Sequence, residues 1–137
     1  MYTLFEWAKA LNINSDRARQ WLNKGYIGVS KPAPGQGKAA EFSTDNIIEI
    51  MAFKRLLDFG MTRPAAAMVL HEVAGWNVVG ASFARVSLLP DLTVKTDFLQ
   101  PGENLSAVMV KGASLSLTLD IDRIAKEVRA ALPKKSG

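Results

Sequence analysis

The stretch NSDRARQWLNKG, residues 14–25, decides how the first half of the chain is interpreted. It predicts a helix that starts near Asn14 or Ser15 and stops at Gly25, with Asp16 in its first turn. Successive residues of a helix are about 100° apart, which places three apolar side chains on one side. These are Ala18, Trp21 and Leu22. The pattern indicates a helix that packs on one side only.

The other side of this helix carries hydrogen-bond donors and amides. Its members are Arg17, Gln20, Asn23 and Lys24, with Arg19 on the shoulder. Such side chains suit phosphate oxygens and the edges of bases. A merely solvated helix would also be polar here, but it would usually mix in acids, and Asp16 is the one acid of this stretch. We therefore favour a binding surface over a solvated one.

Further helices are predicted on both sides of this stretch. Thr3 and Glu6 have the spacing of a capping box in front of a short first helix. Ser43 caps a third helix, and Thr62 caps a fourth that closes near Gly75.

A loop rich in Pro and Gly separates the second helix from the third. Residues 28–38 read GVSKPAPGQGK, a composition that excludes a helix and allows a tight hairpin with Lys31 and Lys38 on either side of its tip. A basic loop beside a basic helix is how a winged helix-turn-helix grips DNA, with the helix in the major groove and the wing on the backbone. A flexible linker is the alternative, although a position between a helix and a strong cap favours a wing.

These elements, in this order, resemble the MerR-type winged helix-turn-helix and the related excisionase-like phage modules. The resemblance covers residues 2 to about 72. It is carried by Tyr2-Thr3-Leu4, Ala8, Ile13, Arg19, Trp21, Gly25-Tyr26-Ile27, Phe42-Ser43, Asp45 and the run KRLLDFGMT at residues 54–62.

The resemblance implies DNA contacts. It assigns Arg19 to the backbone, the base edges to Arg17 and Gln20, and wing phosphates to Lys31 and Lys38. The full set that it implies is Ser15, Arg17, Arg19, Gln20, Trp21, Asn23, Lys24, Lys31 and Lys38. One departure weakens the phosphate grip of the wing, because Ala39-Ala40-Glu41 stand where the family usually has arginines.

The second half predicts a small sheet and one helix. Residues 77–89 are ambiguous between helix and strand, whereas apolar and polar residues alternate from Leu92 to Phe98. Further strands are predicted at 107–110 and 115–119, and Asp120 caps a final helix. The buried stripe of that helix is Ile121, Ile124, Ala125, Val128 and Leu132. So small a unit cannot stand alone. It therefore forms a homodimer, which we favour, or packs on the fourth helix of its own chain.

The predicted fold class is thus α+β in two parts. Residues 1–76 form a winged helix-turn-helix of four helices plus a wing hairpin. Residues 77–137 form a small antiparallel β-meander and a C-terminal helix, and this region is the expected dimerisation element.

Composition and charge limit the classes of function. The 137 residues include no Cys and a single His, which excludes thiolate metal sites and cysteine nucleophiles. No metal, cofactor or enzymatic activity is predicted. Residues 1–40 hold six basic and two acidic residues and so carry the whole net charge of +4, a distribution that favours a polyanionic partner. No apolar run approaches the roughly 20 residues that span a bilayer, and the N-terminus lacks a secretory layout, so we expect a cytoplasmic protein.

The function expected from these observations is sequence-specific binding of double-stranded DNA by a bacterial or phage transcriptional regulator. Two alternatives stay open. A mobile-element factor, either an excisionase or a small packaging subunit, would use the same module, and a packaging subunit would form a ring of many copies. A protein-interaction adaptor that has lost DNA binding is suggested by Ala39-Ala40-Glu41.

Overall fold

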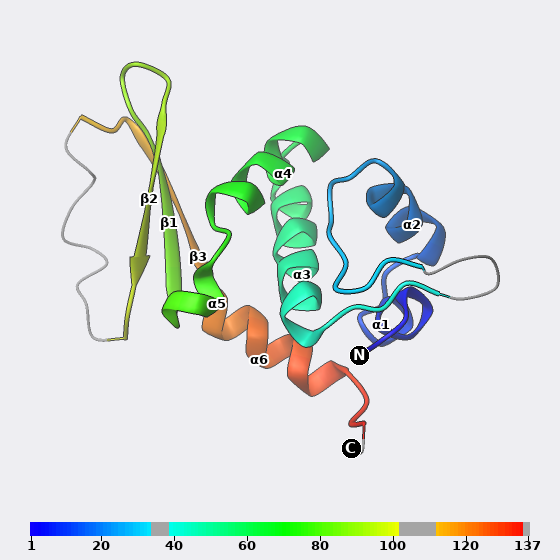
Figure 1. Ribbon diagram of the computed structural model, residues 1–137. Coiled ribbons are helices and arrows are strands. Elements are labelled where there is room, and N and C mark those ends of the chain that lie inside the picture. The colour runs from blue at the N-terminus through cyan, green and yellow to red at the C-terminus, as the bar shows by residue number, and fades with distance from the viewer. Residues whose placement is uncertain (34–38, 102–111, 136–137) are drawn as a thin grey trace.

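The computed structural model describes residues 1–33, 39–101 and 112–135, which form an α+β structure (Figure 1). Four helices come first, followed by a one-turn helix, a three-stranded sheet and a last helix. In chain order these are α1 (Leu4–Ala10), α2 (Ser15–Asn23), α3 (Thr44–Phe59), α4 (Arg63–Glu72), α5 (Trp76–Val79), β1 (Phe83–Leu88), β2 (Val94–Leu99), β3 (Leu115–Asp120) and α6 (Ile121–Ala131).

Local capping residues begin the five longer helices, as the sequence predicts. The side chain of each cap accepts a hydrogen bond from a backbone N–H of the first turn, which satisfies a donor that has no partner inside the helix. The caps are Thr3, Asn14, Ser43, Thr62 and Asp120. At the other end of α3, Gly60 has a φ of 118°, a left-handed conformation that favours glycine.

The sheet is antiparallel with β1 in the centre, in the order β2-β1-β3. The predicted antiparallel sheet followed by a C-terminal helix is confirmed, but its meander order is wrong, since the central strand comes from the segment that the sequence left ambiguous. The sequence does not mark β1 as a strand because some of its buried residues are polar, which removes the alternation of apolar and polar residues. Ser87 is fully buried and shares a hydrogen bond of 2.8 Å with Ser116 on β3, and Arg85 pairs with Asp97 on β2. The strand predicted at residues 107–110 lies outside the described residues.

The described residues between α2 and α3 form isolated bridges rather than the predicted wing hairpin. Lys31 and Glu41 exchange two backbone hydrogen bonds, of 3.0 and 2.8 Å. A second isolated bridge joins Tyr2 to Phe42. The expected tip of the wing falls within residues 34–38, outside the described part of the chain.

One buried cluster of apolar residues runs through both halves of the chain. At its N-terminal end, Trp7 packs edge-on to Phe42 and Trp21 edge-on to Phe53. At its other end, α6 lies against α3 (Figure 1) with all five residues of its predicted stripe buried. The sheet also contacts α4, where Thr96 on β2 donates a hydrogen bond to Glu72. Packing within one chain is thus present, and dimerisation stays a prediction.

One ionic hydrogen bond joins α6 to α3, and a second one within α6 shares its acceptor Glu127. Glu127 accepts from Arg55 of α3 at 2.8 Å and from Arg123 of α6 at 3.2 Å, and these two bonds lower the pKa of Glu127. Because the folded pKa lies below the ordinary value of 4.5, this stabilisation is present above pH 4.5 and is lost as the pH falls through the folded value.

The variant Glu127→Gln is therefore expected to have a weaker dependence of its unfolding free energy on pH in the acid range. Urea denaturation of both proteins at a series of pH values measures this. The curves should converge as the pH falls below about 4.5, the ordinary carboxyl value. Curves that stay parallel over that range would contradict the assigned role of Glu127.

Candidate nucleic-acid interface

The basic side of α2 faces solvent. Ala18 and Trp21 are buried beneath the helix, with at most 1% of their surface exposed. The exposed side chains are Arg17, Arg19, Gln20, Asn23 and Lys24. Figure 1 shows α2 on the side of α3 away from the sheet. The predicted division of this helix into a packed side and an open side is therefore confirmed.

Two aromatic contacts hold α2 against α3. Trp21 meets Phe53 edge-on with ring centroids 5.1 Å apart, and Tyr26, just after the helix, stacks on the same ring at 6.0 Å. Trp21 belongs to the DNA-binding set that the resemblance implies. Its burial leaves it no surface for a ligand, so it fixes the position of α2 instead.

The cations of α2 differ in how they are held. The guanidinium of Arg17 lies 5.2 Å from the centroid of the Trp21 ring, close enough for a cation–π contact. Arg19 is 3.4 Å from Asp16, in an exposed pair that contributes little to stability. Within the described residues, no side-chain hydrogen bond or ion pair occupies Gln20, Asn23 or Lys24, so their polar groups are open to a ligand.

A hollow of about 380 Å³ lies between the start of α2 and the start of α4. Arg17 and Tyr26 line it from one side, and Thr62 and Arg63 from the other. The residues that line it include no acid among those described. Two guanidinium groups that border one hollow without a carboxylate can hold a phosphate between them.

Arg63 is the site residue that sequence reasoning missed. It is exposed in the first turn of α4, and that turn contains no acid. A positive charge is unfavourable at this end of a helix, where the backbone dipole favours anions. The signal available in the sequence was a basic residue, Arg63, directly after the cap Thr62.

The predicted wing contributes less free positive charge to the candidate interface than the sequence suggests. Lys31 is exposed, but its Nζ lies 3.7 Å from a carboxylate oxygen of Glu41, one of the residues that depart from the family pattern. Ser15 is half-buried as the first residue of α2. Lys38 lies outside the described residues. Of the predicted α2 residues, Arg17 therefore borders the same hollow as Arg63.

Metal-site and membrane features complete the description. No group of three or more His, Cys, Asp or Glu residues in the described ranges is arranged to hold a metal ion. None of the described helices combines the length and apolarity needed to cross a membrane. Neither a protein-family model nor a curated protein sequence matches the chain.

Proposed function

We propose that this protein binds double-stranded DNA in a sequence-specific manner, as a bacterial or phage transcriptional regulator built on a MerR- or excisionase-like winged helix-turn-helix. One observation carries the proposal. The donors and amides of α2 are exposed together, while Ala18 and Trp21 anchor the opposite side of the helix in the core. A rigid helix with such a face can enter a major groove and meet base edges.

The contacts fall into two classes. Gln20 is exposed and unpartnered among the described residues, and a Gln amide can pair with both N6 and N7 of adenine. Arg17 was expected to read a base, but its position over Trp21 and beside Arg63 favours a backbone phosphate. In this proposal Gln20 carries specificity, and Arg17, Arg63 and Lys24 carry sequence-independent affinity.

Two substitutions separate these classes. Gln20→Ala is expected to weaken the preferred duplex by about 1–3 kcal/mol and relax the preference at one base pair, because it removes a base contact. Arg63→Ala is expected to weaken preferred and random duplexes alike and to reduce the salt slope by about 1. Fluorescence anisotropy at several salt concentrations measures both, with Lys126→Ala on α6 as the control that changes neither. Equal losses on both duplexes for both variants would contradict the assignment.

Selection of bound duplexes from a random pool, together with the mass of the complex, tests the function itself. An enriched palindrome with two protein copies fits a homodimeric regulator, because two-fold symmetry places two copies on two half-sites. A ring of many copies would point to a packaging subunit. The pairing of Lys31 with Glu41 favours a second candidate, the adaptor without DNA binding. Failure to retain any duplex at low salt would support that adaptor and refute the proposal.

A further inference from the structure

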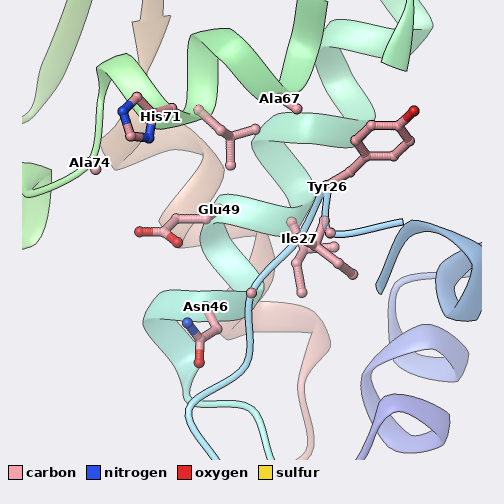
Figure 2. Close-up of a pocket in the computed structure, with 11 residues that line it drawn as sticks. Tyr26, Ile27, Asn46, Glu49, Ala67, His71 and Ala74 are labelled. Atoms are coloured by element: carbon pink, nitrogen blue, oxygen red, sulfur yellow. The ribbon is translucent and has the colours of Figure 1, made fainter. Parts of the chain in front are cut away.

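A second cavity lies between the end of α2, α3 and α4 (Figure 2). Its volume is about 250 Å³, which is space for a small organic molecule rather than a single water. The segment from Gly25 to Gly28 forms one wall, where the chain leaves the basic helix. The cavity is therefore built from three segments that are separate in the sequence.

The two sides of this cavity differ in polarity. Figure 2 shows His71 of α4 with Glu49 and Asn46 of α3 in a column along one side. Tyr26 and Ile27 lie on the other side. An occupant with one polar end and an apolar body would satisfy both sides.

Glu49 is the side chain that determines the chemistry of the polar side. Its Oε1 accepts a hydrogen bond of 3.0 Å from the indole nitrogen of Trp76. Its second oxygen has no hydrogen-bond partner in the described part of the chain. Burial raises the pKa of Glu49, the Trp76 bond opposes this rise, and the charge of Asp45 adds to it. A half-buried carboxylate that accepts a single side-chain hydrogen bond is stabilised by a positive partner.

The described lining of the cavity supplies no permanently charged partner, and its basic side chain is the imidazole of His71. No Lys or Arg is among the described residues that line the cavity. Asp45 accepts a hydrogen bond of 3.1 Å from Asn77, and its negative charge acts on Glu49 in the direction that raises the pKa. The described lining of the cavity thus holds a carboxylate and neither Lys nor Arg, although the chain as a whole carries a net charge of +4.

We propose that this cavity binds a small organic cation, with an ammonium, amidinium or guanidinium group paired to Glu49 and an apolar body against Ile27 and Ala67. The planar, forked donors of an amidinium or guanidinium suit the carboxylate of Glu49, and the cavity volume of about 250 Å³ favours compact cations. This site stands on its own contacts and does not depend on DNA binding.

The test uses the whole chain near neutral pH with three cations as probes, benzamidine, phenethylamine and butylguanidine. Benzamide and benzoate are the neutral and anionic counterparts of the first. At least one cation is expected to shift the Trp76 indole and Ala67 amide signals saturably in NMR titrations, while benzamide and benzoate leave them unchanged. The absence of saturable shifts with all three cations, or equal binding of benzamide, would overturn the proposal.

Two variants connect such binding to this cavity. Glu49→Gln keeps the size of the side chain and an oxygen for the Trp76 bond, and it is expected to weaken cation binding at least tenfold. Ala67→Leu leaves the charge in place but fills part of the cavity, and it should weaken binding as well. The control is Asp58→Asn, which removes an exposed carboxylate of α3, the helix that carries Glu49, and should leave the affinity unchanged. Unchanged affinity in both folded cavity variants would place the cation elsewhere and refute the site.

Discussion

Replacing Trp21 with alanine is expected to lower the free energy of unfolding by about 3–5 kcal/mol, the usual cost of deleting a buried aromatic side chain. Trp21 is 1% exposed and meets Phe53 edge-on, so its removal opens a cavity between α2 and α3. A domain of this size has a total stability of only about 5–15 kcal/mol. The variant should therefore lose much of its folded population, and duplex binding with it.

Urea denaturation followed by circular dichroism measures this loss. Asn23→Ala is the matched control, because it changes an exposed residue of the same helix and should alter stability by no more than about 0.5 kcal/mol. Trp21→Phe should cost less than Trp21→Ala. It keeps a ring against Phe53 and removes an indole N–H that is buried without a hydrogen-bond partner among the described residues. A loss near zero for Trp21→Ala would show that Trp21 does not anchor α2.

The second large effect is expected at Val128 on α6. Its side chain is fully buried against the core that α3 shares, so Val128→Asp places a carboxylate where no partner is available. An uncompensated buried charge costs about 3–5 kcal/mol. Lys126→Asp, at an exposed position of the same helix, is the control and should cost far less.

This substitution also tests whether residues 1–76 behave as an independent domain. Because one buried cluster joins both halves, unfolding of α6 should extend to α1 and α2. The indole N–H signals of Trp7 and Trp21 in NMR spectra report on that end of the core. Native positions of both signals in a Val128→Asp protein whose α6 has unfolded would show that the first half folds on its own.

The five longer helices could be predicted from the sequence because their signals are local, whereas the one-turn helix α5 lies mostly in a stretch that was ambiguous between helix and strand. Thr3 and Glu6 lie within one turn of each other, and Asp120 directly precedes the stripe that α6 buries. The central strand could not be predicted in the same way. The hydrogen-bond partner that makes a buried Ser87 acceptable is Ser116, on a strand that comes 29 residues later.

In the candidate sites too, local features could be predicted from the sequence and contacts between distant segments could not. The exposed face of α2 follows from the angular position of residues on one helix, and this part could be predicted. Arg17 and Arg63 border one hollow because the α3–α4 turn lies beside α2. The cation cavity depends on Glu49 and Trp76, which are far apart in the chain and joined through a side-chain hydrogen bond. Such pairings arise from tertiary packing, which periodicity does not encode.

The position of α6 against α3 has a consequence for synthesis on the ribosome. The face of α3 that α6 covers is made early, since α3 ends at Phe59 and α6 ends at Ala131. At translation rates of about 5–20 residues per second, that apolar face waits on the order of 4–14 s for its cover. The nascent chain thus exposes this apolar face of α3 until α6 has been synthesised.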